Sequence, residues 1–197
     1  MTNETKWSID QAHSEISFKV RHLMISNVKG TFKTFDASIY TVAQNFKTAV
    51  VDLWIDVSSI STGDAKRDEH LKSADFFDVK NHKQIAFSSN TIGDPDKDGN
   101  HELWGELTMR GISKLIKLNI HYGGTIRDPW GNEKAGFTVS GKINRSEWGL
   151  IWNTSVGKGG LMVSDEVIIS CELELTNAGQ KDMVLNLDGR GDHKAIL

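Results

Sequence analysis

The chain has 197 residues, of which 38% are hydrophobic and 25% charged, a composition typical of one globular domain rather than a disordered chain. A formal net charge of −3, without basic stripes interleaved with aromatic residues, argues against a nucleic-acid partner. The polar amino terminus has no apolar signal core, and no apolar run approaches the roughly 20 residues of a membrane helix, so we predict a cytoplasmic protein with no transmembrane segment.

Alternation of apolar and polar residues, which is typical of a strand with one buried face, recurs along most of the chain. In the strand predicted over residues 30–40, the apolar positions change once from one face to the other, as a β-bulge would cause. The alternation predicts strands around residues 16–22, 30–40, 51–57, 85–87, 103–109, 116–122, 135–143 and 167–175.

Turn-forming residues separate several of these strands. Residues 94–100 and 127–132 contain Asp, Pro, Gly and Asn and predict hairpin loops, and residues 109–111 predict a tighter turn. Alternation on one face favours antiparallel pairing, because parallel strands are buried on both faces. Eight antiparallel strands form either a barrel or a two-sheet sandwich, and hairpins between neighbours favour the barrel. The predicted fold class is all-β, an eight-stranded antiparallel up-and-down barrel with one short helix.

The short helix is predicted where the strand pattern is interrupted. Asp64 is a suitable N-cap for a helix over residues 65–74. Arg67, His70 and Leu71 share one face of this helix with Ala74.

The cations on this face need a partner if the face turns inward, because burying an unpaired charge is costly. A structural ion pair with Asp10 or Asp75 would provide that partner. Alternatively, the helix closes the mouth of the barrel, and Arg67 and His70 contact a polar group of a guest.

Residues that could carry catalysis or hold a metal do not form a recognisable arrangement. Seven histidines are present, but none forms the close pair of a helix-borne metal site, and no Cys-x-x-Cys occurs. His13, His22, His70 and His82 would meet only through the fold. Cys171 is in phase with apolar neighbours, which indicates a buried residue rather than a nucleophile. We therefore predict no catalytic residue, no metal site and no cofactor.

The interior of an eight-stranded barrel is wide enough to be filled by side chains or to hold one guest. Gly105, Ala135 and Gly141 fall on presumed inward faces, where small residues either leave free volume or mark bends that help the barrel close. The bulky residues of the inward faces are predicted to line the lumen: Phe18, Val20, Phe32, Phe35, Leu53, Ile55, Phe87, Leu107, Phe137 and Val139.

The strand pattern stops after Leu175. Residues 177–197 are polar and contain glycine, and we predict that most of this tail is disordered. The predicted organisation is a barrel domain over residues 1–176 followed by the tail.

Several motifs, in order along the chain, resemble those of one known family. They are Trp7-x-Ile9-Asp10-x-x-His13-Ser14-x-Ile16-x-Phe18-x-Val20-x-His22, Gly30-Thr31-Phe32-x-x-Phe35, Arg67-Asp68-x-His70-Leu71, Asp75-Phe76-Phe77-Asp78, Gly105-x-Leu107-Thr108-x-x-Gly111, and Gly136-Phe137 with Arg145-x-x-Trp148-Gly149. Over residues 7–175 the chain resembles the YceI-like family of bacterial lipid-binding, polyisoprenoid-binding proteins. It departs from the family at Lys83, where a proline commonly follows the histidine, and in lacking a periplasmic signal peptide that many relatives carry.

The resemblance implies an elongated, lipocalin-like barrel that holds a long isoprenoid or a similar amphiphile. It also implies a homodimer, no catalytic residues, and a role in isoprenoid quinone handling, lipid transport or stress responses.

We therefore predict that the protein binds and carries or stores an amphiphilic long-chain lipid, such as an isoprenoid quinone or a polyprenyl phosphate, in an apolar cavity. Burial of the chain contributes roughly 0.8 kcal/mol per methylene, so few directed polar contacts are needed. Further candidate ligand-binding residues join those of the lumen: His22, Arg67, His70, Arg145 and Trp148.

Two alternatives stay open. An enzyme acting on a bound lipid would use His13, His22, Arg67 and His70. A barrel with a filled lumen would instead serve dimerisation or the docking of a partner.

Overall fold

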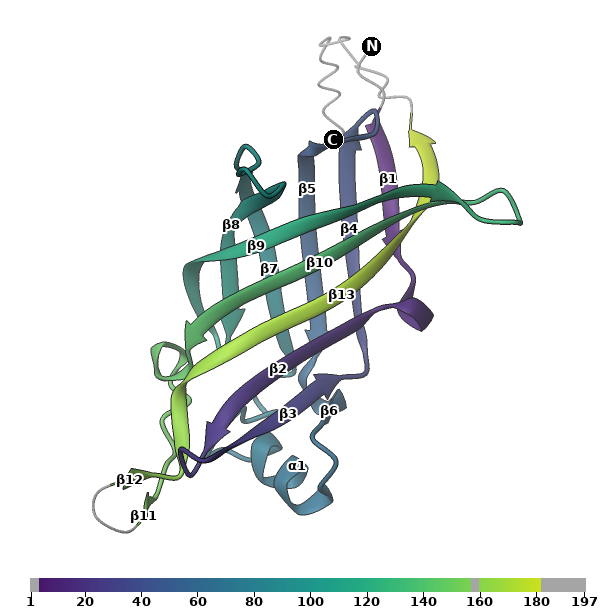
Figure 1. Cartoon of the computed structure of the whole chain (residues 1–197). Helices are drawn as coiled ribbons and strands as arrows, with labels where there is room; N and C mark the ends of the chain where they lie inside the picture. The colour runs from purple at the N-terminus through teal and green to yellow at the C-terminus, as the bar shows by residue number, and fades with distance from the viewer. Residues whose placement is uncertain (1–3, 157–159, 182–197) are drawn as a thin grey trace, which may run out of the picture.

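The computed structural model describes residues 4–156 and 160–181, which are mostly strand (Figure 1). The described helices are α1 (Ala65–Lys72) and the short 3-10 turns η1 (Gln11–His13), η2 (Val57–Ser59) and η3 (Arg145–Trp148). The strands are β1 (Glu4–Ile9), β2 (Glu15–His22), β3 (Ser26–Phe32), β4 (Phe35–Val42), β5 (Asn45–Asp56), β6 (Ile60–Ser61), β7 (Gln84–Ile92), β8 (Asn100–Met109), β9 (Ile112–Arg127), β10 (Glu133–Asn144), β11 (Ser155–Val156), β12 (Gly160–Leu161) and β13 (Val163–Lys181).

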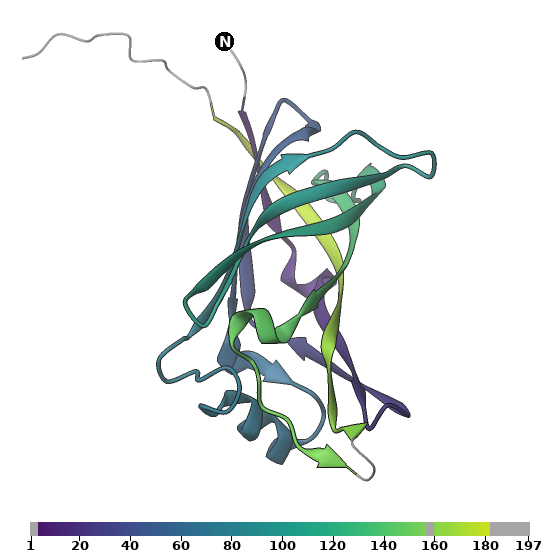
Figure 2. The same cartoon turned by 90° about the vertical axis from the view of Figure 1, so that its left-hand side faces the viewer.

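Eight of these strands close into an antiparallel barrel, in the order β1-β4-β5-β7-β8-β9-β10-β13, with β13 paired back to β1 (Figures 1 and 2). From β4 to β13, each strand of the ring lies beside the ring strand that follows it along the chain, as in an up-and-down barrel. The predicted fold class is therefore confirmed.

β13 is the longest strand because it serves two neighbours on one of its edges. Its first part pairs with β2, from Val163 opposite His22 to Glu172 opposite Glu15. Its last part pairs with β1, so β1 and β2 follow one another along the same edge. β2 pairs in turn with β3, and β3 with β6, which extends the wall of the barrel next to α1 (Figure 1).

The predicted bulge within residues 30–40 is instead a break between two strands. β3 ends at Phe32 and β4 begins at Phe35. The backbone N–H groups of Lys33 and Thr34 both donate to the Oγ of Ser59, at 3.1 and 3.0 Å. β3 pairs with β2, whereas β4 pairs with β1 and β5, so the chain changes partners here. The break explains the change of phase, because it leaves both phenylalanines buried.

Helix α1 begins where it is predicted to begin. The Asp64 carboxylate accepts a hydrogen bond from the backbone N–H of Arg67 at 2.9 Å. The helix ends at Lys72 rather than at residue 74, because the backbone N–H and the Oγ of Ser73 both donate to the carbonyl of His70.

β13 crosses the predicted domain boundary at residue 176. It continues to Lys181, with Asn177 opposite Trp7 and Lys181 opposite Glu4. The barrel therefore extends past the point where the apolar alternation stops, because the ladder is formed by backbone groups and does not require an apolar face. The rest of the tail, residues 182–197, for which we predict disorder, lies outside the described residues.

The glycines on the inward faces do not leave free volume, which was one of the two interpretations of their positions. A Cβ added at Gly105 would stand 2.3 Å from the Cζ of Phe87, and one at Gly141 would stand 2.5 Å from the Cδ2 of Leu118. Each glycine thus accommodates a large side chain of the adjacent strand. Ala135 is buried in a cluster around Trp7. The free space in the barrel must therefore have another origin.

Candidate ligand-binding cavity

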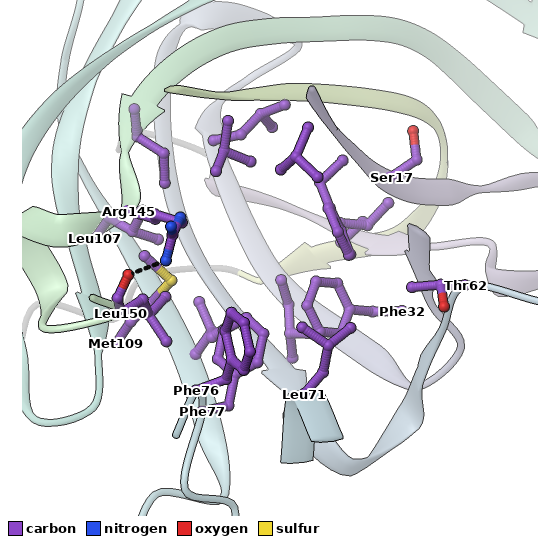
Figure 3. A pocket seen from close by; sticks show the side chains of 18 of the residues that line it. Ser17, Phe32, Thr62, Leu71, Phe76, Phe77, Leu107, Met109, Arg145 and Leu150 are labelled. Atoms are coloured by element: carbon purple, nitrogen blue, oxygen red, sulfur yellow. Dashed lines mark hydrogen bonds between the residues drawn. The ribbon is translucent and has the colours of Figure 1, made fainter. Parts of the chain in front are cut away.

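Two cavities lie inside the described part of the barrel, one near each end. The larger, which we call the helix-end cavity, has a volume of about 480 Å³ and is bounded on one side by α1. Figure 3 shows Phe32, Leu71, Phe76 and Phe77 facing the same space as Leu107. Its size lies within the range of about 300–1,000 Å³ that is usual for small-molecule sites, and its wall is predominantly apolar.

The smaller, turn-end cavity has a volume of about 360 Å³. It lies toward the β4–β5 turn. Gln44 of this turn and Asn45 and Phe46 at the start of β5 contribute to its wall, together with Ile9 from β1 and Tyr122 from β9. The aromatic ring of Phe46 packs against Trp7, Tyr122 and Phe137 at centroid distances of 4.8–5.6 Å, so an aromatic cluster lies at this end of the barrel.

A group of aliphatic side chains, which we call the aliphatic ring, borders both cavities. The ring comes from β5, β8, β10 and β13, so it crosses the barrel from wall to wall. Its members are Val51, Leu53, Leu103, Val139 and Leu173. Because these side chains carry no polar groups, the wall that the two cavities share is apolar.

The structure brings most of the predicted site residues together. Phe137 lines the turn-end cavity, and two of the others, Leu53 and Val139, line both cavities. The predicted residues that line the helix-end cavity are Phe18, Val20, His22, Phe32, Leu53, Ile55, Arg67, His70, Phe87, Leu107, Val139 and Arg145.

Phe35 and Trp148 do not border either cavity, contrary to the prediction. Phe35 is 3% exposed and packs within the hydrophobic core, next to the strand break. Trp148 is 1% exposed, and its Nε1–H donates to the carbonyl of Leu107 at 3.0 Å. Both rings fill the core around the cavity instead of lining it.

Polar side chains gather where α1 meets the helix-end cavity. Arg67 donates from Nε to the Oγ1 of Thr62 at 2.7 Å and from a terminal nitrogen to the carbonyl of the same residue at 2.9 Å. His70 lies 3.0 Å from Asp75, so the predicted carboxylate partner is present for His70 but not for Arg67. Lys66, which is exposed, also reaches the cavity wall.

Arg145 borders the cavity as part of a buried clamp. It is 6% exposed, donates from Nε to the carbonyl of Ser164 at 2.9 Å, and donates from a terminal nitrogen to the carbonyl of Leu150 (Figure 3). Burial lowers the pKa of its guanidinium. These bonds tie η3 to the start of β13, which gives Arg145 a structural role beside any contact with a ligand.

Several residues in the wall of the helix-end cavity could not be predicted from the alternation of apolar and polar residues. Trp152 and Met162 come from the segment between η3 and β13, where no alternation exists. Phe76 and Phe77 belong to a motif of the family, but their place beneath α1 follows from the backbone N–H of Phe77, which donates to the carbonyl of Leu71 at 3.0 Å.

Cys171 is buried in the wall of the helix-end cavity. Burial raises the pKa of its thiol to about 12. The thiol is therefore protonated at neutral pH and is not activated as a nucleophile.

His13 lies away from both cavities, unlike His22, Arg67 and His70, the other residues that an enzyme acting on a bound lipid would use. It joins Asp10 and Glu174 in a group whose ligand atoms lie within 4.8 Å of one another, a spacing that would suit a metal. However, the Nζ of Lys134 lies 2.6 Å from Asp10 and 3.1 Å from Glu174. An ammonium group thus already compensates both carboxylates, and the cluster is an ion-pair network across β10, β13 and η1.

This network predicts a pH dependence of stability. The hydrogen bond from Lys134 lowers the pKa of Asp10 from 3.8 to about 2. Because the folded-state pKa is below the unfolded one, the stabilisation is present above about pH 4 and is lost as pH falls toward 2. We expect Asp10→Asn to lower the free energy of unfolding at pH 7 by about 2 kcal/mol, with the difference shrinking toward pH 2, as measured by urea denaturation.

Glu15→Gln is the matched control. Glu15 pairs with Lys29 at 2.7 Å, but both side chains are about half exposed, so little change is expected at any pH. An Asp10→Asn variant as stable as the wild type at pH 7 would contradict the prediction.

No helix among the described residues is long and apolar enough to cross a membrane.

Comparison with known proteins places the chain in a family. Residues 7–175 match the YceI-like domain. A UPF0312 protein of Staphylococcus epidermidis is 34% identical over 173 residues, which cover 87% of this chain and 98% of the relative. The solved structure of a Campylobacter jejuni YCEI protein has a TM-score of 0.67 and 32% identity, covering 88% of this chain and 96% of that one.

A polyisoprenoid binding domain from Saccharophagus degradans shares the fold, with a TM-score of 0.60 and 13% identity over 87% of this chain and 98% of that one. The domain match spans nearly all of the described barrel, and the resemblance carried by the motifs is confirmed. The chain belongs to the YceI-like family.

Proposed function

We propose that the protein binds and carries or stores an amphiphilic long-chain lipid, a polyisoprenoid such as an isoprenoid quinone or a polyprenyl phosphate. The observation that supports this most strongly is the pair of apolar cavities in line within one barrel, joined by an aliphatic ring. The two cavities together suit a long, thin, apolar chain. A compact metabolite would leave much of their combined volume unfilled. The fold shared with a polyisoprenoid binding domain is consistent with the same guest.

The distribution of charge supports a polar head group at the helix end. Among the described residues that line the helix-end cavity are Lys66, Arg67 and Arg145, but no aspartate or glutamate. A guest with its head between Lys66, Arg67 and His70 and its chain directed into the barrel would keep the head near solvent. A phosphate, or the carbonyl oxygens of a quinone, matches the donors offered there.

We propose binding without turnover. His22 and His70 border the helix-end cavity, but His70 is held by Asp75, and His13 lies elsewhere. Incubation of the protein with a polyprenyl phosphate should therefore leave the lipid intact. A product seen with the wild type and lost in His22→Ala or His70→Ala would favour the enzyme instead.

Native mass spectrometry of freshly purified protein tests the proposed function directly. We expect an excess mass that matches a long-chain lipid and disappears on denaturation. A bare polypeptide, together with no binding of added undecaprenyl phosphate, would contradict the proposal and favour a barrel that serves only docking.

We also propose that the protein is a homodimer and that it is cytoplasmic, and two separate measurements test these proposals. Light scattering measures the mass in solution, and fractionation of cells that produce the protein measures its location.

The role of Arg67 can be separated from a structural one. We expect Arg67→Met to weaken binding of a polyprenyl phosphate by about 1.5–3 kcal/mol, because a charge-assisted hydrogen bond is lost. The melting temperature should change little, since Arg67 is exposed and its Thr62 partner remains accessible to water. Titration calorimetry and thermal unfolding measure the two effects.

Arg21→Met serves as the control, because Arg21 is an exposed arginine on β2 that borders neither cavity. It should leave the affinity unchanged. A fall in stability of Arg67→Met with unchanged affinity would show that Arg67 only braces the loop at Thr62.

A further inference from the structure

The tip of the β2–β3 hairpin exposes three consecutive large apolar residues. Leu23, Met24 and Ile25 are 36%, 54% and 82% exposed. Isolated apolar residues on a surface are normal, but a contiguous group at a protruding tip usually marks a contact site.

The conformation of this turn makes the choice of residues unusual. The backbone N–H of Ile25 donates to the carbonyl of His22 at 3.2 Å, and the two residues between them, Leu23 and Met24, have φ values of 51° and 59°. Hairpin turns with two left-handed residues strongly prefer Asn and Gly, which adopt positive φ at little cost. Leucine and methionine are strained here and exposed as well, so the requirements of folding do not explain them.

A second exposed apolar residue lies next to this tip. The backbone N–H of Leu23 donates to the carbonyl of Met162 at 2.8 Å, which places β12 beside the hairpin, and Leu161 of β12 is 50% exposed. Figure 1 shows β12 and the β2–β3 turn at the same end of the barrel as α1. We call Leu23, Met24, Ile25 and Leu161 the apolar tip.

The apolar tip adjoins the wall of the helix-end cavity. His22 and Met162 line that cavity, and each directly adjoins a residue of the tip in sequence. Lys66 and Arg67 lie on the same cavity wall and supply positive charge. A lipid that leaves the helix-end cavity at this end would emerge beside exposed apolar side chains and cations.

We propose that the apolar tip docks on an anionic lipid bilayer, with its side chains entering the head-group region, so that the guest passes between the membrane and the helix-end cavity. This inference rests on the proposed function. A bilayer fits better than a second copy of the chain, because four residues at a tip are far fewer than the roughly 20–30 per partner of a stable protein interface. Apolar insertion together with attraction of cations to anionic lipids is how peripheral proteins bind membranes.

Flotation with vesicles tests the docking. The double variant Leu23→Asn with Met24→Gly installs the residues that the turn prefers, so it should melt no lower than the wild type. Its binding to equimolar phosphatidylglycerol and phosphatidylcholine vesicles should fall by about tenfold or more, because two of the four apolar side chains of the tip are removed. The wild type should bind phosphatidylcholine vesicles more weakly than the mixed vesicles.

Trp130→Ser is the matched control. Trp130 is 85% exposed in the β9–β10 hairpin loop, which lies far from α1 (Figure 1), so its loss should not change vesicle binding. As an independent measurement, the fluorescence of Met24→Trp should shift to the blue when mixed vesicles are added.

Vesicle binding that is absent in the wild type, or equal in the wild type and the double variant, would overturn the proposal. So would a double variant that turns a dimer into a monomer while its vesicle binding is unchanged, since the tip would then be a protein interface.

The two proposals can fail separately. If purified wild type carries a lipid but ignores vesicles, docking is wrong and the proposed function stands. If it binds vesicles through the tip but neither carries nor takes up a lipid, the proposed function is wrong and docking stands.

Discussion

Val139→Phe is expected to weaken binding of undecaprenyl phosphate by at least about 100-fold while farnesyl phosphate still binds, because exclusion of even one isoprene unit forfeits several methylenes at about 0.8 kcal/mol each. Val139 is 8% exposed and belongs to the aliphatic ring that borders both cavities. A phenyl side chain at this position would reduce the space where the two cavities adjoin. Under the proposed function, the farnesyl chain would occupy the helix-end cavity alone, whereas the undecaprenyl chain would extend into both.

Titration with the two phosphates, which share a head group and differ in chain length, measures this effect. Val50→Phe is the matched control, since Val50 on β5 is 53% exposed and lines neither cavity. Retained farnesyl phosphate binding shows that the variant is folded. An equal loss of affinity for both phosphates, or no loss for either, would mean that the chain of the guest does not extend past the aliphatic ring.

Arg145→Met is expected to lower the free energy of unfolding by about 3 kcal/mol or more, because one buried and one partly buried carbonyl group lose their charged donor. Those carbonyls belong to Ser164 and Leu150, and Leu150 is 4% exposed. The guanidinium also lies 6.0 Å from the ring of Phe76, a contact that methionine replaces only in part. Chemical denaturation measures the loss.

Arg67→Met provides the comparison for this variant. Both arginines line the same cavity, but only Arg145 is buried. We therefore expect a large change in stability for Arg145→Met and a small one for Arg67→Met. If both variants were equally stable, the clamp between η3 and β13 would not hold the fold together.

The fold class and most of the cavity wall follow from the order of the amino acids. Alternation with a period of two assigns each side chain to a face, and in a closed barrel one face must turn inward. The strand pattern alone therefore predicts that residues such as Phe18, Phe87 and Val139 point into the lumen. The start of α1 is equally predictable, since the N-cap bond of Asp64 is local.

The motifs identify the family, but they do not distinguish residues that border the cavity from residues that support it. Trp148 and Phe35 are as apolar as their neighbours, and the sequence indicates that they are buried but not how deeply or against what. Arg145 is a similar case, because its partners are backbone carbonyls, which every residue has.

How the strands close and where the space lies depend on contacts between segments that are far apart in the chain. β13 pairs with both β1 and β2, and it continues to Lys181 beyond the apolar alternation, because the ladder uses backbone groups that are alike at every residue. Gly105 and Gly141 likewise show what cannot be predicted from a single strand. The space left by each missing Cβ is filled by a side chain of the adjacent strand, Phe87 or Leu118. Volume depends on which side chains from distant segments meet, and a pattern along one strand carries no information about its neighbours.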